Sequence, residues 1–269
     1  MTSRIGVLGC GWLGLPLAEC LVSRSYEVHG TTTSLEKQDV LRTKGIQPYI
    51  VELSEKEIKG DIQKLLSNID VLIINIPPRL RGSASESYVT KMTLLHEEIR
   101  KSRVQKIVFV SSTSVYGMVE GEITETTLPE PSTESGRQLL VCEKIFSQDE
   151  NLSCTLIRFG GLIGPSRHPV TMLSKRQNLS NGNHPINLIH LEDCIHMICT
   201  ILEKDYWGKI FNGVYPSHPS KREYYGAEAK SRGIPIPNYL ESSNEAVGKI
   251  VLSKNFLDLG HKFQKSIFS

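Results

Sequence analysis

A glycine-rich turn near the start of the chain constrains the fold more than any other feature. The apolar run Arg4–Leu8 precedes this turn, and leucine and alanine recur at helical spacing over residues 13–21 after it. A strand, a glycine turn and a helix in this order are typical of a dinucleotide-binding unit, because glycines let a pyrophosphate approach the helix N-terminus. The alternative is a tight turn that binds nothing. We therefore assign a cofactor-binding role to Gly9, Gly11, Trp12, Leu13 and Gly14.

Short apolar runs alternate with amphipathic segments through the first 160 residues. Strands are expected at 27–31, 47–51, 71–75, 106–110 and 154–159, with helices between them. This alternation predicts an α/β fold with a doubly wound, mostly parallel, Rossmann-like sheet. Beyond residue 160 the pattern becomes irregular. We expect residues 1–160 to form the dinucleotide-binding core and residues 161–269 a small substrate-side lobe, interleaved with the last strands of the sheet.

Composition excludes several classes of function. The chain has 269 residues and a formal net charge of +2, which gives no sign of binding to nucleic acid or an anionic membrane. No run of about 18 apolar residues predicts a transmembrane helix. The six cysteines show no framework spacing, so we expect reduced thiols and a cytoplasmic protein. No spacing of histidine, cysteine and acidic residues suggests a metal site. The oligomeric state is left open.

Two segments in the middle of the chain carry a family resemblance. Residues 111–117, Ser-Ser-Thr-Ser-Val-Tyr-Gly, resemble the active-site strand of the extended short-chain dehydrogenase/reductase family, the sugar-nucleotide epimerases and dehydratases. Residues 131–139 fall where that family has Tyr-x-x-x-Lys, but Ser135 takes the Tyr position and Leu139 the Lys position. The chain is therefore similar to an atypical branch that keeps the binding half and lacks the usual proton-transfer pair.

The resemblance also implies roles for the residues of the active-site strand. In the family the Tyr acts as a general acid/base, the Lys lowers its pKa and a Ser holds the reacting oxygen. Ser112 matches that Ser, and Ser111 is expected at the cofactor. Tyr116 is the nearest phenol and is a candidate to replace the missing Tyr; ordinary packing is its other interpretation. Losing one general acid/base typically costs about 10²–10⁴ in rate.

The end of the second strand bears on the choice of cofactor. A protein that selects NAD places Asp or Glu there, whereas this chain has Thr31, Thr32 and Thr33 and no acid. The sequence therefore favours NADP, with NAD as the alternative. The resemblance further implies that Glu52 and Leu53 lie beside the adenine. It places three other residues against the nicotinamide ribose, namely Ile76, Pro77 and Pro78.

Basic residues are expected on the substrate side. Segment 158–165 resembles the family's Arg-x-x-x-x-x-Gly-Pro stretch after the sixth strand, and segment 187–193 resembles its Phe-Ile-His-Val-Asp-Asp segment. A guanidinium in the cleft could bind phosphate or carboxylate through two hydrogen bonds, although a solvated loop charge is the alternative for most of these side chains. The candidates are Arg79, Arg81, Arg137, Arg167 and His168.

Two functions follow from these observations. The first is an oxidoreductase or epimerase acting on a small anionic or sugar-nucleotide substrate. The second is a non-catalytic nicotinamide-binding module with a redox-sensing or regulatory role. The glycine turn supports both. The retained serine strand and the basic cleft favour the enzyme, whereas the missing Tyr and Lys favour the module.

Overall fold

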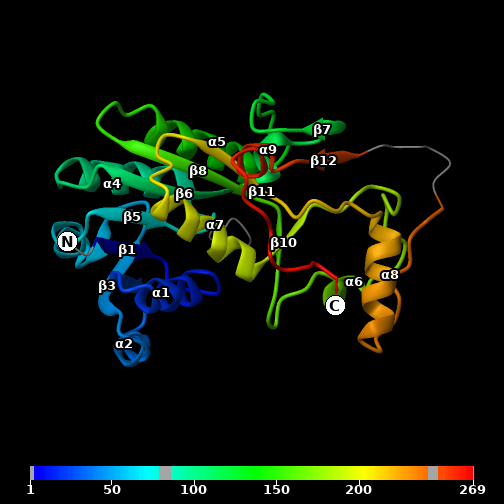
Figure 1. The fold of residues 1–269 in the computed structure, drawn as a ribbon, viewed down its shortest axis with the longest axis horizontal. Coiled ribbons are helices and arrows are strands. Elements are labelled where there is room, and N and C mark those ends of the chain that lie inside the picture. Colours follow the sequence, from blue (N-terminus) through cyan, green and yellow to red (C-terminus); the bar gives the residue numbers. More distant parts are fainter. Residues whose placement is uncertain (1–2, 79–85, 242–247, 269) are drawn as a thin grey trace.

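The computed structural model describes residues 3–78, 86–241 and 248–268. An eight-stranded sheet forms its centre, in the order β11-β8-β6-β5-β1-β2-β3-β4 (Figure 1). The strands, in that order, are Ile210–Gly213, Ser153–Phe159, Lys106–Ser112, Val71–Ile74, Arg4–Leu8, Glu27–Thr32, Gln47–Leu53 and Ile58–Gly60. Neighbouring strands are parallel except β3 and β4. The predicted doubly wound, mostly parallel α/β fold is confirmed.

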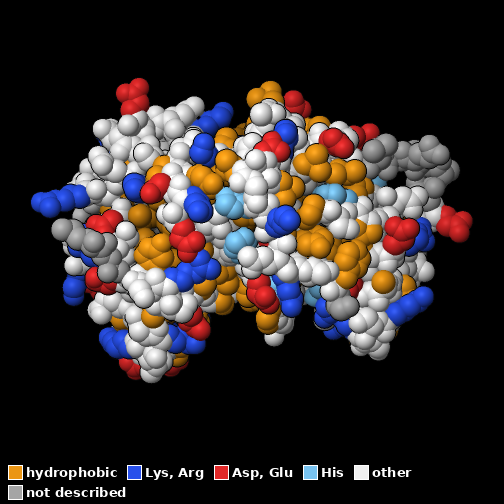
Figure 2. Space-filling view, viewed as in Figure 1, with side chains coloured by type: hydrophobic (Ala, Val, Ile, Leu, Met, Phe, Trp, Pro, Cys, Tyr) orange, Lys and Arg blue, Asp and Glu red, His pale blue; other side chains and the backbone are white. Residues whose placement is uncertain are grey.

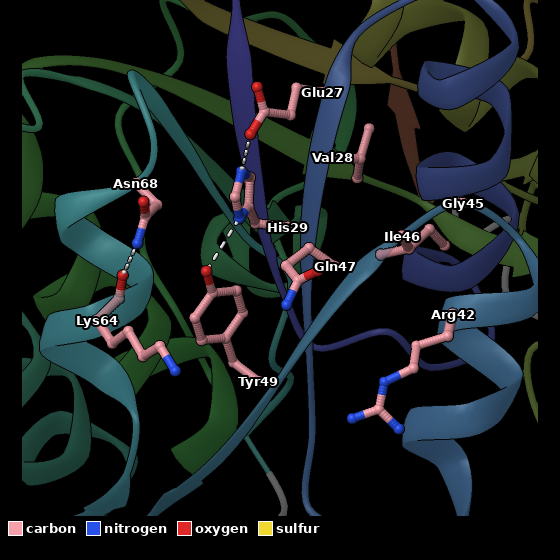
Figure 3. Close-up of a pocket in the computed structure, with 10 residues that line it drawn as sticks. All are labelled: Glu27, Val28, His29, Arg42, Gly45, Ile46, Gln47, Tyr49, Lys64 and Asn68. Atoms are coloured by element: carbon pink, nitrogen blue, oxygen red, sulfur yellow. Dashed lines mark hydrogen bonds and ion pairs between the residues drawn. The ribbon is translucent and has the colours of Figure 1, made fainter.

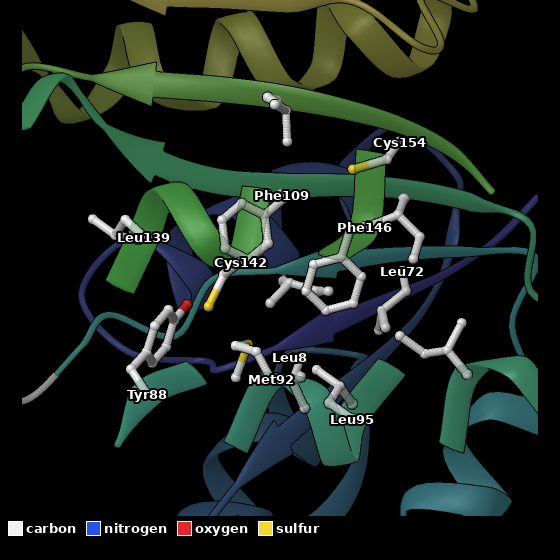
Figure 4. Close-up of a cluster of buried hydrophobic side chains, with 14 of the residues drawn as sticks. Leu8, Leu72, Tyr88, Met92, Leu95, Phe109, Leu139, Cys142, Phe146 and Cys154 are labelled. Carbon is white, nitrogen blue, oxygen red and sulfur yellow. The ribbon is translucent and has the colours of Figure 1, made fainter. Parts of the chain in front are cut away.

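Helices cover both faces of this sheet. On one face pack α3 (Ile62–Ser67), α4 (Tyr88–Arg100) and α5 (Glu134–Ser147). On the other pack α1 (Gly14–Ser23), α2 (Leu35–Thr43) and α7 (Leu191–Glu203). The central strand β5 is buried throughout because its alternate side chains enter the two separate cores. Figure 4 shows the first core, where side chains of α4 and α5 meet those of the strands.

The chain beyond residue 160 builds a lobe and also returns to the sheet. The lobe contains β9 (Gly161–Ile163), α6 (Val170–Leu173), β10 (Leu188–His190) and α8 (Lys221–Ser231), and it has its own small apolar core. Strand β9 pairs with β10. Between these elements, α7 covers the main sheet and β11 forms its edge. Residues after position 160 therefore contribute both to the lobe and to the main sheet, and the division of the chain at residue 160 stays a prediction.

The remaining elements connect the lobe to the end of β6. The 3₁₀ turn η1 (Thr113–Tyr116) follows β6 and leads to β7 (Gly121–Ile123). Strand β12 (Lys249–Val251) pairs with β7 and is followed by α9 (Lys254–Asp258). In Figure 1, β7 and β12 run side by side above the lobe. The C-terminal segment thus lies next to the turn that was expected to carry chemistry.

The surface and the helices give two further observations. Figure 2 shows acidic and basic side chains interspersed over one face of the molecule.

Within the described ranges, no helix combines the length and the apolar character needed to cross a bilayer.

Candidate functional site

The glycine turn joins β1 to α1 and lies against the ends of β2 and β5. The Gly9 N–H donates to Thr31 Oγ1 at 2.9 Å, and Asn75 Nδ2 donates to the Gly9 carbonyl at 3.2 Å. Gly9 has a φ of +102°, which favours glycine. A Cβ at Gly14 would lie 2.1 Å from the Gly9 oxygen. Two glycines of the motif are therefore required by the tight turn itself.

Gly11 has a different environment. A Cβ built there meets no heavy atom within 4 Å, and the residue is exposed. It lies three residues before Gly14, where the ten-residue helix α1 begins, and its carbonyl accepts the Leu15 N–H. None of the described residues accepts from the N–H groups of Trp12 and Leu13, which stand between Gly11 and the helix. The Leu13 side chain is buried, so only its backbone can face a ligand. The open space at Gly11 and the helix start together fit a dinucleotide pyrophosphate.

The ends of β2, β3 and β5 lie at the same edge of the sheet as this turn. At β2, Thr31 is buried and its hydroxyl oxygen already accepts from Gly9, whereas Thr33 is exposed. The Thr32 hydroxyl accepts from the Ser34 N–H. The other predicted cofactor residues at this edge are Glu52 and Leu53, which end β3 beside β4, and Ile76, Pro77 and Pro78, which follow β5. Their cofactor contacts stay predictions.

Ser112 ends β6 at this carboxyl edge. Its side chain is half-buried, and its Oγ accepts the Ser114 N–H at 3.1 Å, which caps η1. This bond fixes the serine at the strand end and leaves its hydroxyl hydrogen for another acceptor. Ser112 therefore has a position compatible with holding a substrate oxygen.

A buried polar network lies behind Ser112. Ser111 Oγ donates to Glu143 Oε1 at 2.6 Å, and the Arg158 guanidinium pairs with the Glu143 carboxylate at 2.6 Å. Arg158 also donates to Tyr116 Oη at 2.9 Å, and this hydroxyl donates to Asn212 Oδ1 at 2.9 Å. All five side chains are buried. The network therefore ties β6, η1, α5, β8 and β11 together.

This network corrects two sequence expectations. Tyr116 is fully buried with its hydroxyl bonded on both sides, and burial raises its pKa, so the phenol is neither exposed to a substrate nor activated as an acid. Its packing interpretation fits the structure better than a catalytic one. Ser111 points to the opposite face of β6 from Ser112, because successive strand residues alternate. Its hydroxyl binds Glu143 and not a cofactor site.

Helix α5 packs directly on the turn after Ser112. A Cβ at Gly136 would lie 2.6 Å from the Ser114 oxygen, so only glycine allows this approach. Leu139 is buried in the apolar core, near Phe109 and Cys142 (Figure 4), and Ser135 is half-buried. Neither residue supplies a phenol or a cation. The loss of the proton-transfer pair, with Ser135 and Leu139 in its place, stays a hypothesis.

Lys249 is a residue that the sequence analysis missed. Its Nζ donates to the carbonyls of Thr113 at 3.2 Å and Gly117 at 2.8 Å. Burial lowers its pKa, and the positive charge of Lys221 lowers it further. An ammonium thus sits on the turn that follows Ser112. No local pattern could have indicated this contact, because 132 or more residues separate the partners.

Three of the predicted substrate residues are described, and two of them do not form a free anion site. Arg137 pairs with Glu134 in its own helix at 3.1 Å, and its side chain is 55% exposed. His168 Nε2 lies 3.0 Å from Tyr224 Oη, and burial lowers the pKa of His168 to about 4. The histidine is therefore neutral at pH 7 and part of the lobe core. Arg79 and Arg81 lie outside the described residues.

The third, Arg167, lies at the glycine turn. Its guanidinium stands 4.8 Å from the Trp12 ring centroid, and Trp12 Nε1 donates to the Pro165 carbonyl at 3.0 Å. The structure therefore brings this predicted substrate residue next to the glycine turn.

A separate polar cavity of about 640 Å³ opens where β2 and β3 begin. His29 stands in it between Tyr49 Oη, at 3.2 Å, and Glu27 Oε1, at 3.0 Å (Figure 3). Because it lies at the amino ends of parallel strands, this cavity is at the edge opposite the glycine turn. Among the described residues, no group of three or more histidine, cysteine or acidic side chains could hold a metal ion.

Comparison with known proteins places the chain among relatives. Protein YeeZ of Escherichia coli K12 is 34% identical over 264 residues, covering 97% of this chain and 96% of YeeZ. The structure of MoeE5 in complex with UDP-glucuronic acid and NAD superposes with a TM-score of 0.79 at 18% identity, covering 98% of this chain and 95% of MoeE5. UDP-glucuronic acid 4-epimerase from Bacillus cereus, in complex with NAD, gives 0.77 at 20% identity, covering 98% and 92%.

The two structural comparisons show that the fold is shared. The sequence comparisons also show the family. A model of the NAD dependent epimerase/dehydratase family matches residues 5–212. That match includes the glycine turn, the serine strand and α5. The chain therefore belongs to the NAD dependent epimerase/dehydratase family.

Proposed function

We propose that the protein binds a nicotinamide dinucleotide along the carboxyl edge of the sheet and acts on a small anionic or sugar-nucleotide substrate. The observation that carries this proposal is the open space at Gly11 in front of α1, with Ser112 at the same edge. The match to the family model supports the cofactor class. The complexes of MoeE5 and the Bacillus cereus epimerase with NAD support it too.

The chemistry divides between the cofactor and the chain. A bound nicotinamide would supply hydride transfer. The backbone N–H groups of Trp12 and Leu13 would hold phosphate, because the Gly11 N–H already donates to the Gly9 carbonyl, and the Ser112 hydroxyl would orient the substrate oxygen. No phenol serves as the acid at Ser135, so a substrate group or water carries the proton. Losing this general acid/base is expected to lower the turnover rate about 10²–10⁴-fold relative to a site that has it.

The substrate class follows from two kinds of support. MoeE5 has been solved with UDP-glucuronic acid and with UDP-glucose, both of which are anionic sugar nucleotides. In this chain, the partly buried cation of Lys249 lies on the turn that follows Ser112, at the edge where such a substrate would enter. This positive charge favours a ligand with negative charge.

A second candidate function is a nicotinamide-binding module without turnover. Specific observations favour it: the Tyr116 phenol is held by Arg158 and Asn212, and Leu139 is buried in the core. Such a module would report the redox state of its cofactor to a partner. It would bind the dinucleotide as tightly as the enzyme would, so binding alone does not separate the two candidates.

A glycine variant tests the cofactor site. Gly11→Ala puts a methyl group into the space assigned to the pyrophosphate while meeting no protein atom, so folding should be kept and dinucleotide affinity should fall at least tenfold. Gly226→Ala in α8 is the matched control, since its Cβ has its nearest neighbour at 4.0 Å and it lies in the lobe. Calorimetric titration with NADH and NADPH measures both. Equal affinity of the wild type and Gly11→Ala would refute the site.

The same titration tests the cofactor preference. Because β2 ends without an acid, we predict tighter binding of NADPH than of NADH; the reverse order would remove only this preference. Turnover is tested by incubating the protein with NAD or NADP and either UDP-glucuronic acid or UDP-glucose. Absorbance at 340 nm follows reduced cofactor, and chromatography follows epimerised sugar. Binding without any product across this panel would favour the non-catalytic module.

A further inference from the structure

A rigid turn from the lobe presents Arg167. The Gly164 N–H donates to the Arg167 carbonyl at 2.9 Å, and the Arg167 N–H donates back to the Gly164 carbonyl at 3.0 Å. Ser166 takes a left-handed conformation with a φ of +57°, and Gly164 has a φ of +154°. These two reciprocal hydrogen bonds fix the backbone of a four-residue turn. The Cα–Cβ direction of Arg167 is therefore fixed as well.

Trp12 docks this turn onto the glycine turn. Its Nε1 donates to the Pro165 carbonyl, and a Cβ at Gly164 would lie 3.2 Å from Trp12 Cζ2. The indole therefore fills the space that a side chain at position 164 would need. Trp12 directly follows Gly11, the residue with open space around it. A contact across 153 residues thus joins the lobe to the cofactor turn.

The charge of Arg167 is available to a ligand. Its guanidinium lies over the face of Trp12 at 4.8 Å, and the side chain is exposed. Among the described residues, no carboxylate forms an ion pair with it, whereas Arg4, Arg42 and Arg158 each have one. Cation–π stacking uses the flat face of the guanidinium and leaves its N–H edge for hydrogen bonds.

We propose that Arg167 binds a phosphate of the dinucleotide at the glycine turn, and that Trp12 positions it for this contact. A guanidinium matches a phosphate through two parallel N–H donors, and the start of α1 already favours an anion at this point. The inference rests on the proposed cofactor site. It reassigns Arg167 from substrate binding, predicted from the sequence, to cofactor binding.

Fragments of the cofactor test the proposal through binding alone. The chain has two tryptophans, and Trp207→Phe leaves Trp12 as the single fluorophore at the site. ADP-ribose carries the pyrophosphate and adenosine does not. In the Trp207→Phe protein, Arg167→Ala should weaken ADP-ribose binding about tenfold or more, as for a hydrogen bond to a charged group, and leave adenosine binding unchanged. The matched control is Arg176→Ala, an exposed arginine of the same lobe.

The outcomes separate the inference from the function on which it rests. Equal ADP-ribose affinity with and without Arg167, in folded protein, would overturn the inference and leave the cofactor site intact. Failure of the unmutated site to bind ADP-ribose would overturn both. A loss confined to UDP-glucose, with ADP-ribose affinity unchanged, would assign the cation to a substrate phosphate and so also overturn it. Trp12→Phe removes both the Pro165 hydrogen bond and the fluorophore, so its ADP-ribose affinity is measured by calorimetric titration. It should reproduce part of the Arg167→Ala loss for ADP-ribose, and no change there would overturn the positioning role.

Discussion

The buried pair of Glu143 and Arg158 gives the sharpest test of how the site is held. Their side chains are 2% and 4% exposed, and Ser111 and Tyr116 add further hydrogen bonds. Glu143→Gln removes the negative charge and leaves the guanidinium buried without a counter-charge. Breaking a buried pair in this way costs about 3–5 kcal/mol. Each kcal/mol shifts the melting temperature by about 2–4 °C in a chain of this size, so we expect a fall of roughly 6–20 °C.

Thermal unfolding followed by circular dichroism measures this shift. The control is Asp39→Asn, which breaks an ion pair with Arg42 whose side chains are 81% and 56% exposed. Such a pair is worth about 0–1 kcal/mol. The double variant Glu143→Leu with Arg158→Met should recover part of the loss, because no unpaired charge then remains buried. A melting temperature for Glu143→Gln within the range of the control would refute the reasoning.

Three further predictions concern residues whose interpretation the structure changed. Tyr116→Phe should lower stability by about 1–3 kcal/mol in urea unfolding, because partners are left unsatisfied, and should leave any turnover rate unchanged; a rate loss above tenfold would restore its catalytic role. Arg137→Ala should change neither ADP-ribose affinity nor melting temperature measurably, since it is exposed and paired within its helix. The pKa of His168 is about 4 in the folded protein, below its ordinary 6.5. Between these two pH values the unfolded state therefore binds a proton at His168 that the folded state does not bind. Stability should therefore fall as pH drops from about 6.5 to 4, and His168→Gln should flatten that part of the pH profile.

Most of the fold could be predicted because each strand carries its own signal. Strand β5 is an apolar run, as a strand buried on both faces must be, and the glycine turn marks the start of α1. One segment shows the limit of periodicity. Ile58 stands four positions before Ile62, a spacing that fits a helix containing both, but residues 58–60 form β4 against the edge of β3. An isolated isoleucine four positions before a helix fits either structure.

The candidate site was harder to predict because side-chain direction depends on tertiary contacts. The spacing of the serine strand located Ser112 and Tyr116, yet it could not show that the phenol turns toward Arg158 and Asn212 in the interior. Nor could it show that Arg167 reaches the glycine turn. These contacts join segments that are distant in the sequence, so no local pattern encodes them.

Residues from the second half of the chain supply cations to both turns at the carboxyl edge. Arg167 reaches the glycine turn through Trp12, and Lys249 reaches the turn after Ser112 through two carbonyls. At the same edge, α5 contributes Leu139, which has no charge. Both of these cations come from residues after position 160. The glycine turn and the serine strand lie in the first half of the chain, so the presence of these two cations beside them depends on how the second half docks.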